Sequence, residues 1–197
     1  PLTLRNSARS APHVITLFED EGTHLEEWLV SDRSELLDDF DNSRVTWINI
    51  DGLGDIDVLR LLGERFNLHP LALEDVLDTG QRPKVEHFDD YLFIVAEMLY
   101  LEKGEQMCGE QVSMFLGKTF LITLQEEADF DVFEPVRARI RAGSGQVRKS
   151  GPDYLAYALL DSIIEHYSTV RQSVGLACSR IKTSQGDVPC KQSVCAR

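Results

Sequence analysis

Short β-branched and apolar runs recur along the first 125 residues, and each has the length and composition of a strand. The runs are "HVITLF" at 13–18, "VTWINI" at 45–50, "YLFIVAEMLY" at 91–100, "QVSMFLG" at 111–117 and "TFLITLQ" at 119–125. The last two runs meet at Gly117 and Lys118, a tight connection that predicts a β-hairpin.

Apolar residues at helical spacing lie between and after these runs. Helices are predicted at 55–66, 133–142 and 152–174, with one or two shorter helices within 22–40. Asp55 is placed to cap the first of them. The predicted helix at 152–174 has a wide apolar face that includes Leu155, Leu159, Ile163 and Tyr167.

A further helix is expected to begin at Pro70, because a missing N–H does no harm in the first turn, and to stop at Gly80. Its apolar positions form one stripe for burial: Leu73, Val76 and Leu77. Its acidic positions face away from that stripe: Glu74, Asp75 and Asp78.

Strands with interspersed helices predict an α/β fold with a mixed sheet covered by helices. We expect residues 1–151 to form this α/β domain and residues 152–174 to form a helix that leads away from it. Residues 175–197 lose both the apolar period and the acidic character, so we expect an atypical tail there, disordered or artefactual.

The net charge of −13 is unevenly distributed and narrows the classes of function. Residues 1–135 hold 29 Asp and Glu against 10 Lys and Arg, whereas residues 136–197 hold 4 against 10. The large acidic part argues against nucleic-acid binding, which depends on cationic neutralisation of phosphates. It is compatible with attracting cations, although an acidic surface also serves solubility alone.

Several kinds of site lack a sequence signature. There is no G-x-S-x-G motif, Walker A loop or G-x-G-x-x-G fingerprint, and the His and Cys residues lack zinc-ligand spacing. The longest apolar stretch is far shorter than the roughly 20 residues of a membrane-spanning helix. The few cysteines in the main body of the chain suit a reducing compartment.

Oxygen-ligand metal chemistry stays open, because Mg²⁺ keeps most of its waters and takes only one or two protein carboxylates. Glu74 and Asp75 at the start of a helix suit such a site, but so do many surface helices. Asp161 lies beside the apolar face of the 152–174 helix. We interpret Arg82 and Lys84 as ion-pair partners that shape a turn.

Five basic residues after position 136 are interpreted as a solvated helix face and turn, with carboxylate pairing as the second choice: Arg137, Arg139, Arg141, Arg148 and Lys149.

Longer motifs carry a resemblance to a known family. "WINIDGLGD", "HPLALEDVLDTGQRPKVEHFDDYLFIV", "EQVSMFLGKTFLITLQE", "FEPVRARIR" and "PDYLAYALLDSIIEHY" occur in this order over roughly residues 12–172. In order and spacing they resemble the cytoplasmic N-terminal region of the CorA family of divalent-metal transporters. The resemblance implies a three-layer α/β/α domain with a mixed central sheet, followed by the start of a long stalk helix.

The resemblance also implies function and site residues. It implies a homopentamer on the cytoplasmic side of the cell membrane that senses Mg²⁺, with Co²⁺ as a second cation, and catalyses nothing. Asp75 would reach the stalk helix of an adjacent subunit, and Glu74 and Asp161 would contribute to a second, nearby metal site.

The chain lacks the Gly-Met-Asn tripeptide of the family's pore mouth and any membrane span, so we expect a soluble fragment whose only membrane link is the missing C-terminal spans. The alternatives are the soluble domain of a zinc exporter of the same superfamily, a free-standing Mg²⁺-dependent enzyme, and a self-associating structural module.

Overall fold

The computed structural model describes residues 14–20, 24–37, 44–102, 106–126 and 131–184. Its strands are β1 (Val14–Asp20), β2 (Leu25–Leu29), β3 (Val45–Asp51), β4 (Lys84–His87), β5 (Tyr91–Glu102), β6 (Gln106–Gly117) and β7 (Phe120–Gln125). They form one sheet in the order β2-β1-β3-β7-β6-β5-β4. β3 and β7 pair in parallel and the other neighbours pair antiparallel, so the predicted mixed sheet is confirmed.

The hairpin predicted at Gly117 and Lys118 joins β6 to β7. A Cβ atom at Gly117 would lie 2.2 Å from the ring of Phe120, so any residue other than glycine would force that ring to move. The strands of the neighbouring hairpin, β5 and β6, are longer than the sequence predicted, because pairing continues from Tyr91 opposite Gly117 to Glu102 opposite Gln106.

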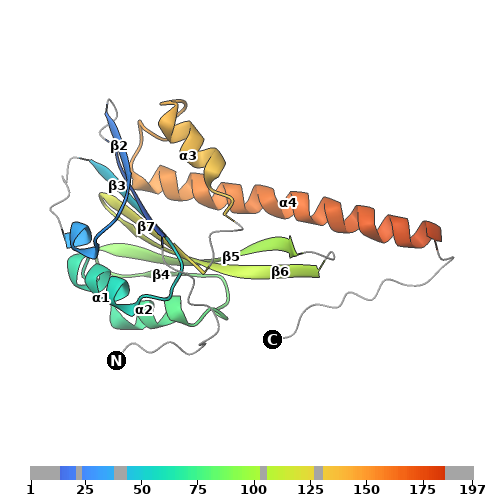
Figure 1. Ribbon diagram of the computed structural model, residues 1–197, viewed down its shortest axis with the longest axis horizontal. Coiled ribbons are helices and arrows are strands. Elements are labelled where there is room, and N and C mark those ends of the chain that lie inside the picture. Colours follow the sequence, from blue (N-terminus) through green and yellow to red (C-terminus); the bar gives the residue numbers. More distant parts are fainter. Residues whose placement is uncertain (1–13, 21–23, 38–43, 103–105, 127–130, 185–197) are drawn as a thin grey trace.

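The helical elements are η1 (Arg33–Leu37, a 3-10 helix), α1 (Ile56–Arg65), α2 (Pro70–Leu77), α3 (Glu134–Arg141) and α4 (Pro152–Ser184). Figure 1 shows η1, α1 and α2 on one face of the sheet, and α3 and α4 on the other. The three-layer α/β/α fold is therefore confirmed.

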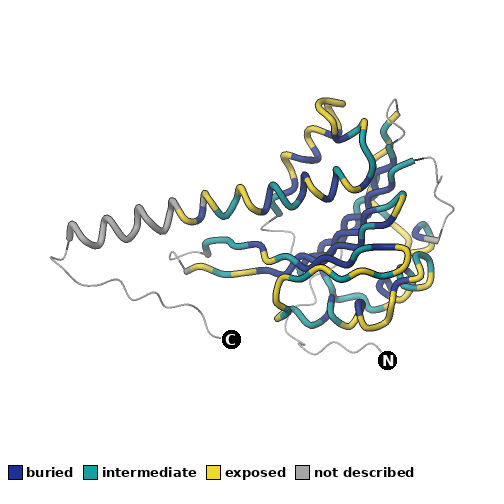
Figure 2. The backbone as a smooth tube through the Cα atoms, turned by 180° about the vertical axis from the view of Figure 1, so that it is seen from behind, coloured by how far each residue is buried: buried dark blue, intermediate teal, exposed yellow. Residues whose placement is uncertain are grey.

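Each face of the sheet has its own hydrophobic core, and the buried segments of Figure 2 converge on the sheet. Ile48 and Phe93 face the α1–α2 layer, whereas Trp47 and Met114 face the α3–α4 layer. Successive residues of one strand, such as Trp47 and Ile48 of β3, thus enter opposite cores, because side chains alternate between the two faces of a sheet.

The helix starts follow the predicted capping chemistry. The side chain of Asp55 accepts a hydrogen bond from the backbone N–H of Asp57 at 3.0 Å, and α1 begins at the next residue after Asp55. α2 begins at Pro70, with Nδ1 of His69 accepting from the N–H of Leu71. It ends at Leu77 with Asp78 as its C-cap, so the stop expected at Gly80 comes earlier.

The prediction of one or two short helices within residues 22–40 is wrong in part. Leu25, Trp28 and Leu29 have helical spacing, yet they lie in the edge strand β2, which pairs with β1. Backbone pairing with an open sheet edge overrides the local pattern. Of the described residues in this range, 24–37, those of η1 keep the predicted helical character, and residues 22, 23 and 38–40 lie outside the described residues.

The predicted end of the last helix at residue 174 is also wrong. α4 continues through Gly175 to Ser184, so ten residues assigned to the atypical tail are helical, and the remainder, 185–197, lies outside the described residues. At 1.5 Å per residue its 33 residues span about 50 Å, and Figure 1 shows it projecting beyond the body of the domain. Within the part of the chain that the structure describes, no helix is both long and apolar enough to cross a membrane.

Candidate functional site

The acidic face of α2 is tied to the edge strand β4 by one lysine. The Nζ of Lys84 lies 2.6 Å from Oδ2 of Asp75 and 2.9 Å from Oε1 of Glu86. All three side chains keep part of their surface in water, at 25%, 28% and 44% for Lys84, Asp75 and Glu86. The ion pairing expected for Lys84 is therefore confirmed, and Arg82 lies exposed beside it.

Lys84 is held over an aromatic ring as well as between two carboxylates. Its ammonium lies 5.7 Å from the ring centroid of Phe93. The hydrogen bond to Asp75 is the main cause that raises the pKa of Lys84, and Glu86 adds to it. The side chain of Lys84 is therefore positively charged in this cluster at physiological pH.

A buried glutamine fixes the backbone that carries Asp75. The amide nitrogen of Gln111, on β6, donates to the carbonyl of Asp75 at 3.0 Å, and its oxygen accepts from the N–H of Gln81 at 3.2 Å. The side chain of Gln81 in turn donates to Asp78 at 2.9 Å. These bonds hold the end of α2 and the following turn in one position against the sheet.

The other predicted ligands lie apart from each other. Glu74 is exposed on α2, whereas Asp161 is half-buried on α4. Because α2 and α4 cover opposite faces of the sheet, Glu74 and Asp161 of one chain do not share a surface (Figure 1). Among the described residues, no three His, Cys, Asp or Glu side chains are grouped so that they could hold a metal ion.

The basic residues of α3 and of the loop after it form a second polar region, and the first interpretation of them as a solvated face is wrong for Arg137 and Arg148, whose side chains are largely buried. Arg137 is 7% exposed and pairs with Asp131, with its guanidinium 5.5 Å from the ring centroid of Trp47. Arg141 binds both carboxylate oxygens of Glu27 on β2 at 2.7 Å.

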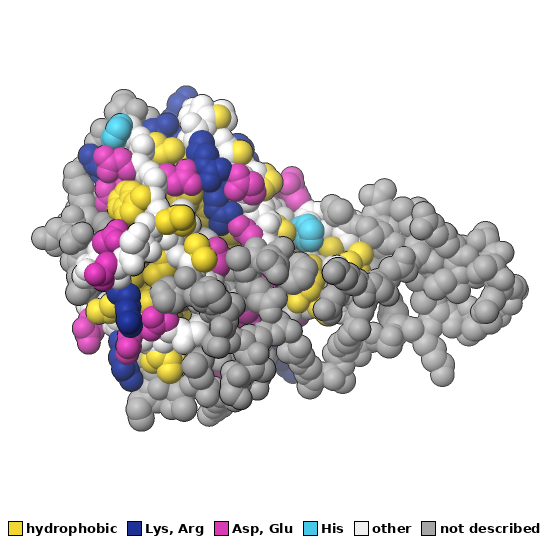
Figure 3. Space-filling view, viewed as in Figure 1, with side chains coloured by type: hydrophobic (Ala, Val, Ile, Leu, Met, Phe, Trp, Pro, Cys, Tyr) yellow, Lys and Arg dark blue, Asp and Glu magenta, His cyan; other side chains and the backbone are white. Residues whose placement is uncertain are grey.

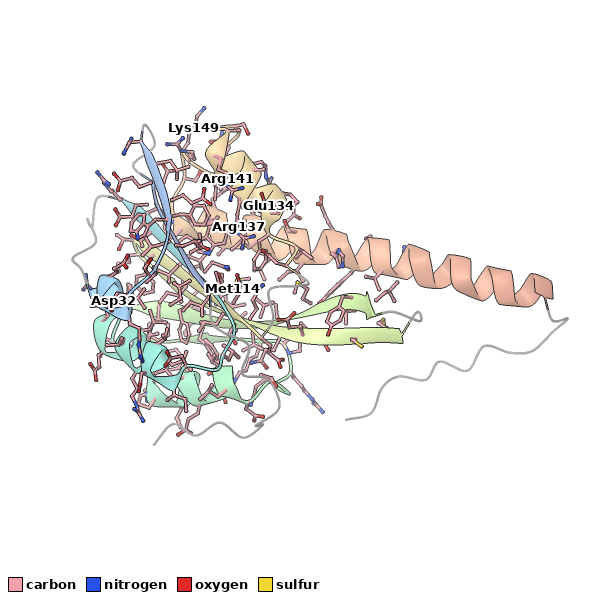
Figure 4. The ribbon with its side chains drawn as sticks, viewed as in Figure 1. Asp32, Met114, Glu134, Arg137, Arg141 and Lys149 are labelled. Carbon is pink, nitrogen blue, oxygen red and sulfur yellow. The ribbon has the colours of Figure 1, made fainter. Side chains whose placement is uncertain are left out.

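Arg148 binds Asp20 at the end of β1 at 3.0 Å. Carboxylate pairing, the second choice, therefore describes these arginines. Figure 4 shows Arg137 and Arg141 on α3 together with Glu134, and Figure 3 shows basic and acidic side chains interleaved on this face. The pairs fasten α3 and the loop after it to the strands.

A cavity of about 470 Å³ opens between α3 and the ends of β1, β2 and β3. Asp51 and Asp131 both line it. Asp51 is 8% exposed and accepts from the amide of Asn49 at 3.1 Å. Burial, followed by repulsion from Asp131, raises the pKa of Asp51 to about 6.

Neither the bridging position of Lys84 between Asp75 and Glu86 nor the cavity beside Asp51 could be predicted from the sequence. Lys84 is nine residues from Asp75, and only the turn after α2 brings them together. Asp51 and Asp131 are 80 positions apart. One feature of the sequence does point to the cavity: Asn49 and Asp51 are two positions apart at the end of a strand, so two polar side chains lie on the same face of the sheet.

Comparison with known proteins decides the family. A family model described as "CorA-like Mg2+ transporter protein" matches residues 42–183. This chain belongs to the CorA-like family. The match includes the first part of the segment that was expected to be an atypical tail.

A family relative from Thermotoga maritima, named cobalt/magnesium transport protein CorA, is 42% identical over 149 residues. The aligned residues cover 75% of this chain and 42% of that relative, so the chain spans less than half of the relative's length.

Solved structures agree on the fold. The soluble domain of CorA from Methanocaldococcus jannaschii gives a TM-score of 0.65 at 14% identity, covering 85% of this chain and 63% of that one. The ZntB cytoplasmic domain from Vibrio parahaemolyticus gives a TM-score of 0.67 at 10% identity, covering 89% and 68%. At these identities the two likenesses show the shared fold alone.

Proposed function

We propose that this chain is the cytoplasmic metal-sensing domain of a CorA-like magnesium/cobalt transporter. In this proposal it binds regulatory Mg²⁺ between subunits of a homopentamer and catalyses no reaction. Family membership and the name of the Thermotoga relative support the choice of transported cations.

The placement of the carboxylates carries the proposal. Glu74 and Asp75 lie on α2 and Asp161 lies on α4, in different layers of the fold. A metal site that uses carboxylates from both α2 and α4 therefore needs α2 of one chain to face α4 of another. Such a site exists only in an assembly, which is the property that a sensor between subunits requires.

The donor set fits Mg²⁺. Asp75, Glu74 and Asp161 offer hard carboxylate oxygens, and at least two of them are accessible from solvent. Mg²⁺ is bound in proteins by one or two carboxylates together with its waters. The bound ion would supply positive charge between carboxylates that otherwise repel each other, while the hydrogen bond from Gln111 holds the backbone of Asp75 in place.

Such a site couples metal concentration to the state of the assembly. In the clamped state, a metal ion joins carboxylates of two neighbouring subunits. A ligand that binds only this state stabilises it by RT ln(1 + [L]/Kd), about 2.7 kcal/mol at a hundredfold excess over Kd. Five such interfaces would hold a pore closed when intracellular Mg²⁺ is abundant and release it when Mg²⁺ is scarce.

The zinc-exporter alternative rests on the ZntB likeness, which at 10% identity concerns the fold. Metal-specific uptake or efflux by the full-length protein separates the two. The enzyme alternative would need a nucleophile or general base beside the acidic cluster. The basic side chain beside Asp75 is Lys84, and its ammonium is hydrogen-bonded to Asp75 and Glu86, so it supports neither role.

The test is transport by the full-length protein in vesicles, with Mg²⁺ titrated on the cytoplasmic side. We expect Asp75→Ala and Asp161→Ala each to lose much of the inhibition by internal Mg²⁺, because each removes a carboxylate from one of the two proposed sites between subunits. Asp57→Ala, which removes an exposed carboxylate from α1, is the matched control. Wild-type sensitivity in both site variants would refute the assignment of these residues.

A further inference from the structure

The carboxylate that is proposed to bind Mg²⁺ already has a cation of its own. Lys84 reaches Asp75 from β4 at 2.6 Å, a distance typical of a charge-assisted hydrogen bond. The ammonium approaches Oδ2, one of the two oxygens with which Asp75 would ligate a metal. The side chain of Lys84 is only 25% exposed, so it packs within the cluster and does not extend into solvent.

An ammonium and a divalent cation cannot both sit close to the same carboxylate without repulsion. At about 4 Å two unit charges in water repel by about 1 kcal/mol, and a divalent ion doubles this figure. Metal binding at Asp75 therefore requires Lys84 to move away from Oδ2 or to be tolerated at a loss of affinity.

The structure also provides the place to which Lys84 can withdraw. The same ammonium lies 2.9 Å from Glu86, the residue two positions along β4. Glu86 and Lys84 point to the same side of that strand, because side chains two apart share a face. A small rotation of the lysine chain would keep its pair with Glu86 and its place near Phe93 while freeing Asp75.

We propose that Lys84 is a built-in competitor of the regulatory metal at Asp75. It occupies the carboxylate when Mg²⁺ is scarce, and it lowers the affinity of the site so that only a high Mg²⁺ concentration displaces it. This inference rests on the proposed function, since it concerns the affinity of the same site, and it assigns Lys84 a role in setting the concentration at which the sensor responds.

The experiment is isothermal titration of Mg²⁺ into the full-length protein and its variants. Lys84→Met removes the charge and keeps an unbranched chain beside Phe93, and Lys84→Arg keeps the charge. We expect Lys84→Met to bind Mg²⁺ about fivefold more tightly, because a partly exposed ion pair of about 1 kcal/mol no longer opposes the metal. Lys84→Arg should stay within about twofold of the wild type.

Two controls isolate the effect. Lys149→Met removes one positive charge beyond α3, on the other side of the sheet (Figure 4), and should leave the affinity unchanged. Thermal unfolding without Mg²⁺ checks that each variant is folded. Asp75→Asn, alone and combined with Lys84→Met, should bind weakly in both backgrounds, because the competitor has no effect once its target is gone.

The outcomes separate the two proposals. If Asp75→Asn weakens binding while Lys84→Met leaves it unchanged or also weakens it, Lys84 is not a competitor and the metal site stands. If Asp75→Asn leaves Mg²⁺ affinity unchanged, the proposed site itself is wrong.

Discussion

At the scale of single residues, one line of polar side chains runs along β3 on the face of the sheet that α3 and α4 cover. The indole N–H of Trp47 donates to Thr123 at 3.0 Å, Thr123 donates to Asn49 at 2.7 Å, and Asn49 donates to Asp51. The line ends at Asp51, in the cavity beside Asp131. Ionised Asp51 therefore lies in a place that disfavours negative charge.

The pKa of Asp51 predicts how the stability of the domain depends on pH. Its folded pKa of about 6 lies above the ordinary value of 3.8, so the folded chain binds the proton more tightly than the unfolded chain. The resulting stabilisation is fully present below about pH 3.8 and is lost as the pH rises through about 6. The loss is about 3 kcal/mol by pH 7, at 1.36 kcal/mol for each pKa unit.

Asp51→Asn should therefore raise the free energy of unfolding at pH 7.5 by about 2 kcal/mol, because the amide carries no charge and its NH₂ can face Asp131. The gain should vanish near pH 4, where Asp51 is protonated. Urea denaturation of the domain at both pH values measures it, with the exposed Asp57→Asn as control. A variant less stable than the wild type at pH 7.5 would contradict the account.

At the scale of elements, the sequence predicted helices well wherever an apolar stripe was wide. Leu73, Val76 and Leu77 of α2 are buried as expected, and so are Leu155, Leu159 and Ile163 of α4. The strands that were missed lie at the sheet edges. β2 and β4 are short, polar strands whose formation depends on β1 and β5 as hydrogen-bonding partners, and no local pattern reports a partner.

The packing of α4 gives a prediction at this scale. Leu159 is fully buried against the sheet, whereas Ile164 on the same helix is 60% exposed. Leu159→Ala should lower the free energy of unfolding by about 3 kcal/mol, because it leaves a cavity in the core, and Ile164→Ala should change it by less than about 1 kcal/mol. Urea denaturation of the two variants measures both changes. If the two substitutions lowered the free energy of unfolding equally, α4 would have to pack on the sheet through a different face.

At the scale of the whole molecule, the candidate site could be predicted only in part. The motif around "HPLALEDVL" identified Asp75 and Glu74, since their resemblance to the family is carried by consecutive residues. Neither the pairing of Lys84 with Asp75 nor the separation of Asp75 from Asp161 by the sheet could be inferred, because both depend on how distant elements pack. The opposite placement of α2 and α4 is what turns the proposed metal site into a property of the assembly.

The central claim is that Mg²⁺ binds between subunits, at one proposed site through Asp75 and at a second through Glu74 and Asp161. Limited proteolysis of the full-length protein, with Mg²⁺ titrated, tests it most directly, because a clamped interface shields the cleavage sites along it. We expect Asp75→Asn and Asp161→Asn each to raise the Mg²⁺ concentration for half-maximal protection by at least about tenfold, a loss of about 1.4 kcal/mol. The control Asp57→Asn should behave as the wild type. Protection curves of both site variants that coincide with the wild-type curve would contradict the account.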